Sequence, residues 1–116
     1  MKAIRLSSIA LLLSFAFAAC ALTANAQKAP IKIFMSPRSN VPLADIVKNL
    51  NDKCSNATVV SDSTKSDYML EAVGWPNGYK FVLFKKGGEV VYATTTAWLS
   101  NSVKDVCKYV NAHPAQ

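Results

Sequence analysis

The stretch Tyr79-Lys-Phe-Val-Leu-Phe-Lys-Lys86, followed by Gly87-Gly88 and Glu89-Val-Val-Tyr-Ala-Thr-Thr-Thr96, decides the fold class of this sequence. Its two halves are rich in β-branched and aromatic residues, which favour strands. The adjacent glycines supply the positive φ angles that a tight hairpin turn requires. The stretch is therefore predicted to form a β-hairpin.

The pairing within this hairpin decides which of its side chains reach a core. If the two glycines form the turn, Phe84 lies opposite Val91 and Val82 lies opposite Ala93. Successive side chains of a strand point to opposite faces, so both faces of the hairpin are partly apolar. The two sets that share a face are Val82, Phe84, Val91 and Ala93, and Phe81, Leu83, Val90 and Tyr92. We take the second set as a contact surface left outside the core, and the opposite assignment stays open.

Apolar patterns on both sides of the hairpin add further strands and two helices. Strands are expected at residues 31–35, 57–61 and 67–74. Residues 43–54 carry apolar side chains at helical spacing. A second amphipathic helix is expected to begin at an N-cap, Ser100, and to end before Pro114. The order β-α-β-β-β-β-α predicts an α+β fold, a two-layer α/β sandwich of about five strands with two helices on one face.

The N-terminal segment has the three parts of a signal peptide. Lys2 and Arg5 precede an uncharged apolar run over residues 9–22, and small residues then lead to Ala24-Asn25-Ala26. The run is shorter than the roughly 20 residues that span a bilayer. Cleavage after Ala26 is expected, which divides the chain into a signal peptide, 1–26, and a single small α/β domain, 27–116. The protein is then exported, either periplasmic or secreted.

An alternative concerns Cys20. Phe17-Ala-Ala-Cys20 is similar to a bacterial lipobox, in which a lipidated cysteine becomes the mature N-terminus. An acylated chain would be held at a membrane surface. A lipid anchor through Cys20 is therefore the alternative to the soluble exported form.

Two cysteines remain beyond the expected cleavage site. Cys54 lies at the end of the first helical stripe and Cys107 lies within the second. An even pair in a small exported domain indicates a disulfide. Such a bridge requires both helices on the same side of the sheet. The alternatives are two buried thiols or a redox-active pair, although redox chemistry usually uses closely spaced thiols with a lowered thiolate pKa.

Charge and composition exclude some functions. The chain carries 13 Lys and Arg against 7 Asp and Glu. Without Lys2 and Arg5, the net charge falls to about +4 and is scattered along the chain. No basic stripe of the kind that binds nucleic acid is present, so no nucleic-acid partner is expected.

Candidate catalytic and metal-binding residues find no partners in the sequence. The single histidine, His113, has no evident partner for acid–base work. Ser36, Ser39 and Ser61 have no identifiable base. Asp62 and Asp67 flank a polar loop that lacks the calcium-loop pattern. No catalytic residue, cofactor or metal site is therefore expected. The aromatic residues that could form an exposed patch for a partner or glycan are Trp75, Tyr79, Tyr92 and Trp98.

Three segments resemble known families. Lys65-Ser-Asp-Tyr-Met-Leu-Glu71 is similar to the Ala-Asp-Tyr-x-Leu strand of periplasmic lipoproteins of the curli-assembly and penicillin-binding-protein-activator type, in which a strand leads into a hairpin and a helix. The segment from Leu99 to Cys107 resembles the closing helix of small exported bacterial domains of unassigned function. Residues 81–91 and the following helix look like the closing hairpin and helix of thioredoxin. Met35-Ser-Pro-Arg38 stands where that family has Cys-x-x-Cys, so this last resemblance implies a binding domain without redox activity.

These observations together predict a non-catalytic binding or envelope-associated module. Its expected partner is an envelope protein or a cell-wall polymer, and a homodimer through the sheet face is a further expectation. The alternative function is an enzyme whose site is dispersed along the chain.

Overall fold

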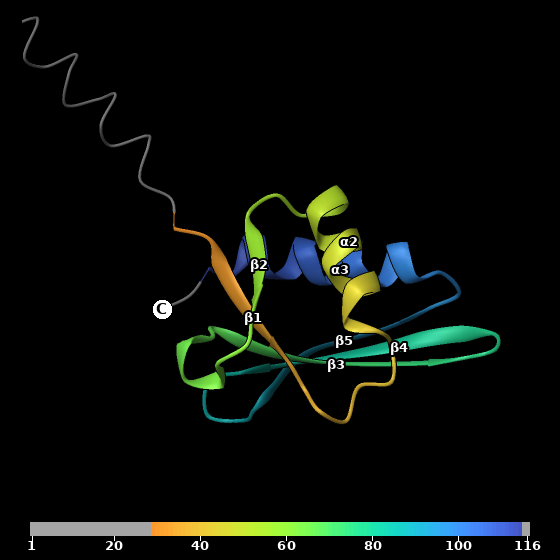
Figure 1. The fold of residues 1–116 in the computed structure, drawn as a ribbon, viewed down its shortest axis with the longest axis horizontal. Coiled ribbons are helices and arrows are strands. Elements are labelled where there is room, and N and C mark those ends of the chain that lie inside the picture. Colours follow the sequence, from red (N-terminus) through yellow and green to blue (C-terminus); the bar gives the residue numbers. More distant parts are fainter. Residues whose placement is uncertain (1–28, 115–116) are drawn as a thin grey trace, which may run out of the picture.

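Residues 29–114 are described in the computed structural model of the protein (Figure 1). The expected signal peptide, its cleavage after Ala26 and the lipobox at Cys20 lie outside the described residues.

Five strands form one mixed sheet. They are β1 (Ile31–Met35), β2 (Ala57–Val60), β3 (Tyr68–Trp75), β4 (Gly78–Lys85) and β5 (Val90–Thr96), and their order across the sheet is β2-β1-β3-β4-β5. The two pairings of β1, with β2 and with β3, are parallel, whereas β3–β4 and β4–β5 are antiparallel. A short 3₁₀ turn, Ser63–Lys65, precedes β3. The predicted α+β class and element order are confirmed.

Two helices cover one face of this sheet. They are α2 (Leu43–Lys53) and α3 (Leu99–Ala112), and Figure 1 shows both on the same side of the strands. Their apolar stripes and one face of the sheet form the core. Its principal members are Ile31, Ile33, Ile46, Leu50, Leu70, Ala72, Phe81, Leu83, Val103, Val106 and Val110. The predicted N-cap of α3 is wrong: Trp98 is the cap, and Ser100 lies inside the helix.

Cys54 and Cys107 lie at disulfide distance. Cys54 caps the C-terminal end of α2 and Cys107 faces it from α3. Their Sγ atoms are 2.12 Å apart and their Cα atoms 5.6 Å apart. The pair ties the two helices together on the covered side of the sheet, as its prediction requires.

The predicted hairpin is present, but its turn is one residue longer than predicted. The Lys85 N–H donates to the Glu89 carbonyl, and the two glycines within the turn have φ angles of 104° and 92°. Phe84 therefore pairs with Val90, not with Val91. A bulge then accommodates Val91 as an extra residue, after which Val82 pairs with Ala93 as predicted.

This register corrects the predicted contact surface. Phe81 and Leu83 are 0% exposed and belong to the core, so their assignment to a surface is wrong. Tyr92 is half-buried and packs against the core, as does Val91. Only Val90, which is 53% exposed, stays outside the core. Val82, Phe84 and Ala93 lie on the face away from the core, which is the assignment that the sequence analysis left open. The bulge exchanges residues 90 and 91, so Val91 packs against the core and Val90 does not.

Candidate functional site

The face of the sheet opposite the helices carries an apolar surface, which we call the open face. Side chains on this face alternate with buried residues along β3 and β4, and each is half-buried or exposed. Its apolar members are Phe34, Val60, Met69, Val73, Val82, Phe84, Val90 and Ala93. Neither α2 nor α3 lies on this side (Figure 1). Five strands about 4.8 Å apart and roughly 20 Å long give this face an area of roughly 480 Å². Contiguous apolar surface on a monomer often marks a functional site.

Charged side chains interrupt the open face. Glu71 lies on β3 opposite Val82, and Arg38 approaches it from the loop after β1, with its Nε 3.2 Å from Glu71 Oε1. Within residues 29–114, this Oε1 atom is buried and accepts no hydrogen bond, so the contact with Arg38 is an ion pair without hydrogen-bond geometry. Lys32 and Lys80 are exposed on the same face. The open face therefore presents both a carboxylate and cations among apolar side chains.

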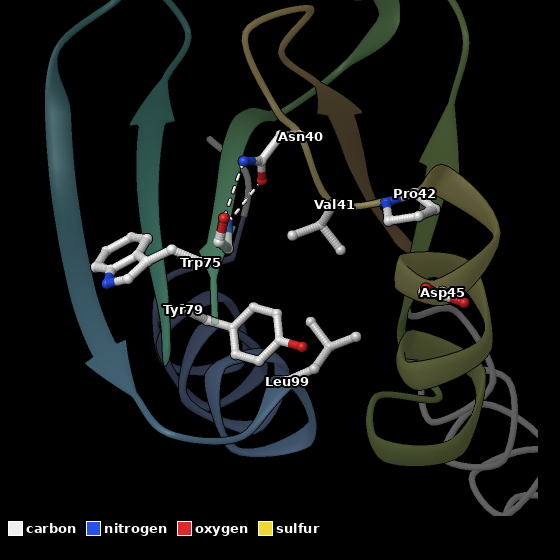
Figure 2. A pocket seen from close by; sticks show the side chains of 8 residues that line it. Asn40, Val41, Pro42, Asp45, Trp75, Tyr79 and Leu99 are labelled. Carbon is white, nitrogen blue, oxygen red and sulfur yellow. Dashed lines mark hydrogen bonds between the residues drawn. The ribbon is translucent and has the colours of Figure 1, made fainter. Parts of the chain in front are cut away.

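A cavity of about 250 Å³ lies at one end of the covered side, between the starts of α2 and α3 (Figure 2). Val41, Tyr79 and Leu99 point toward one another across it, whereas the Trp75 ring points away. A Cβ at Gly74 would lie 2.9 Å from Tyr79 Cε1, so glycine permits the close approach of this ring. Asn40 fixes the same strand end by accepting from the Gly74 N–H at 2.7 Å and donating to its carbonyl at 2.9 Å. The described lining includes no Ser, Cys, His or Lys side chain, so it offers no nucleophile–base pair.

The predicted aromatic patch is not assembled as one surface. Trp75 and Trp98 are exposed, at 46% and 69%. Tyr79 lines the cavity of Figure 2. Tyr92 instead stacks on Tyr109 of α3, with ring centroids 5.1 Å apart.

The candidate serines hold a loop against the sheet. Ser39 Oγ accepts from the Ala72 N–H at 2.9 Å, and Ser36 Oγ accepts from the Arg38 N–H at 3.2 Å. The first contact joins the loop after β1 to β3, and the second lies within that loop. Ser61 is exposed. These contacts give Ser36 and Ser39 a structural role.

The candidate aspartates are likewise occupied by local hydrogen bonds. Asp62 Oδ1 accepts from the hydroxyl and the N–H of Thr64, and these two bonds lower the pKa of Asp62. Asp67 Oδ2 accepts from the Lys32 N–H at 2.9 Å. Among residues 29–114, no group of three or more His, Cys, Asp or Glu side chains is arranged to hold a metal ion.

His113 lies at the C-terminal end of α3 within a cluster of aromatic rings. Its ring stacks on Tyr109 at 4.1 Å, and Nδ1 lies 3.0 Å from the Tyr109 carbonyl oxygen. The Tyr68 hydroxyl donates to the His113 carbonyl. Burial, together with neighbouring Tyr109 and Asp67, raises the pKa of Tyr68 and so keeps this donor protonated. The only signal of this cluster in the sequence is the four-residue spacing of Tyr109 and His113 within a helical segment.

Comparisons of the chain with protein-family models, with curated proteins and with solved structures found no match. In the described part of the chain, no helix is both long enough and apolar enough to cross a membrane.

Proposed function

We propose that the chain is an exported, non-catalytic contact module whose working surface is the open face of its sheet. The observation that carries this proposal is the row of apolar side chains that neither helix covers. Leaving this surface in water has a cost, because burying apolar surface contributes about 25 cal/mol per Å². The serines and aspartates bond to nearby groups of the chain, and the two candidate residues that line one cavity, Asp67 and His113, each have a backbone partner. No observation favours the enzyme alternative.

The occupant that we propose for this face is a second copy of the chain. A twofold pair brings the same surface together from both partners, so the surface must be complementary to itself. We propose that Glu71, whose Oε1 contacts Arg38 of the same chain, contacts Lys32 or Lys80 of the second copy through its other carboxylate oxygen. Two faces of roughly 480 Å² bury about 1,000 Å² in total, near the lower limit of specific interfaces. Sheets packed in this way lie about 10 Å apart, with their side chains interdigitated.

Sedimentation equilibrium of the exported protein tests this proposal. The wild-type protein is expected to dimerise, and a variant with Val82→Thr and Phe84→Thr to sediment as a monomer. Threonine keeps the strand preference of these positions while removing apolar area. Burial of one Phe side chain is worth about 2 kcal/mol, and each change occurs twice in a twofold pair. The dissociation constant should therefore rise at least about a hundredfold.

Leu43→Thr is the matched control, because Leu43 is 54% exposed on α2, away from the open face. This variant should dimerise like the wild type, and all three proteins should keep the wild-type circular dichroism spectrum. A monomeric wild-type protein at millimolar concentration contradicts the proposed assembly. Unchanged dimerisation of the Val82/Phe84 variant would place the interface elsewhere.

Export itself is a separate part of this proposal. The signal-peptide pattern at residues 1–26 and the Cys54–Cys107 pair at disulfide distance both support it, because disulfides persist in oxidising compartments. The intact mass of the protein recovered from the periplasm or medium of an expressing bacterium should correspond to Gln27–Gln116. A protein that stays in the cytoplasm with residues 1–26 attached refutes export. A diacylglyceryl adduct beginning at Cys20 would instead establish the lipid-anchored alternative.

A further inference from the structure

A second cavity, of about 440 Å³, lies at the end of the molecule where α3 finishes. Figure 1 shows the C-terminal end of α3 and the turn between β4 and β5 at the same end of the fold. The cavity is lined by Tyr68 and Asp67 of the β3 region, Lys85, Lys86 and Val91 of the hairpin, and Tyr109, His113 and Pro114 of the α3 end. Its volume is within the range of small-molecule sites, about 300–1,000 Å³.

One wall of this cavity is aromatic and held in place. Tyr109 is stacked between Tyr92 and His113, with interplanar angles of 20° and 15°. Tyr68 meets Tyr109 edge-on at 6.3 Å. The bond from the Tyr68 hydroxyl to the His113 carbonyl joins β3 to the end of α3. Ring edges and faces arranged in this way accept another flat ring in offset or edge-on contact.

The part of the lining that the hairpin contributes is cationic. Lys86 forms no ion pair with any described residue. Lys85 Nζ lies 3.1 Å from a carboxylate oxygen of Glu89, but both side chains are more than half exposed, and such surface pairs are weak. The Lys85 ammonium group can therefore leave Glu89 and bind a stronger hydrogen-bond acceptor. Asp67 is the one carboxylate in the described lining of this cavity. Its Oδ2 already accepts a hydrogen bond from the Lys32 N–H.

We infer that this cavity binds a small organic anion with a planar ring, such as an aromatic carboxylate. The ring packs against the tyrosine and histidine wall, and the carboxylate accepts hydrogen bonds from Lys86 and Lys85. Charge-assisted bonds of this kind are stronger than those between neutral groups. Tyr68, Val91 and Tyr109 are buried or half-buried, so the ring leaves water when it binds. This site lies on the helix-covered side of the sheet, and the inference does not depend on the proposed assembly through the open face.

The inference can be tested by titrating 4-hydroxybenzoate into the isotope-labelled exported protein and following its amide NMR signals. Saturable shifts are expected at Lys86, Val91, Tyr109 and His113, with a dissociation constant of about a millimolar or below, in keeping with the small size of the ligand. Lys86→Ala should weaken binding about tenfold. Lys48→Ala, which removes an exposed lysine from α2, should leave the dissociation constant unchanged.

Two analogues separate the contributions of ring and charge. Benzamide keeps the ring and lacks the anionic group, and cyclohexanecarboxylate keeps the anion and lacks the aromatic ring. Each should bind at least about fivefold more weakly than 4-hydroxybenzoate if both walls act together. Equal binding of benzamide, an unchanged constant for Lys86→Ala, or no saturable shift at about 20 mM ligand would overturn the inference.

Discussion

Replacing Phe81 by alanine is expected to lower the free energy of unfolding by about 3–5 kcal/mol, which is typical of Phe truncation in a packed core. Phe81 is 0% exposed and pairs across the sheet with Ala72, which is also 0% exposed. Ala72 is too small to fill the space that the ring vacates, so a cavity remains beneath the helices. Urea unfolding followed by circular dichroism measures the change.

Phe84→Ala is the matched control, because the two phenylalanines lie three residues apart on β4 but on opposite faces. Phe84 is half-buried on the open face, and its truncation in the dissociated protein should cost less than half as much as that of Phe81. Both variants must be compared at a concentration where the protein is monomeric. Equal destabilisation by the two changes would contradict the assignment of the open face.

The hairpin shows which features of its structure could be predicted from the sequence and which could not. Alternation along residues 79–96 predicted which side chains share a face, and it was wrong only at Val90 and Val91. It could not establish which face is buried, because both faces carry large apolar residues. Alternation also does not predict the longer turn or the bulge at Val91. Each of them shifts the strand register by one residue, and from Leu83 onward the two shifts cancel.

The sites at the two ends of the sheet were beyond prediction for a different reason. Tyr68, Tyr92 and Tyr109 come from three separate elements, and their contacts arise only when α3 packs over β4 and β5. By contrast, the apolar stripes of α2 and α3 placed Cys54 and Cys107 on buried faces. Since two cysteines remain beyond the expected cleavage site, a disulfide between them could then be predicted. Local periodicity predicts elements and faces, whereas convergence of distant side chains depends on the tertiary arrangement.

Removing the Cys54–Cys107 bridge is expected to lower the free energy of unfolding by about 4 kcal/mol. The cysteines are separated by 53 residues in sequence, and linking chain positions that far apart restricts the unfolded ensemble by roughly this amount on the loop-entropy model. Net stabilities of about 5–15 kcal/mol are usual for natural domains, and a domain of about 90 residues lies toward the small end of that range. The bridge therefore contributes a large share of the net stability. Urea unfolding of the Cys54→Ala, Cys107→Ala double variant, compared with the oxidised wild-type protein, measures it.

Reduction of the wild-type protein is the control that separates the bond from the packing of its side chains. Cys54 and Cys107 are 2% and 6% exposed, so reduction leaves two buried thiols in a core of nearly unchanged shape. If the bond itself stabilises the fold, reduced wild-type protein should unfold close to the double variant and well below the oxidised form. If reduced and oxidised proteins unfold at the same urea concentration, or if both thiols react in the native unreduced protein, there is no bridge. The link between α2 and α3 would then rest on side-chain packing alone.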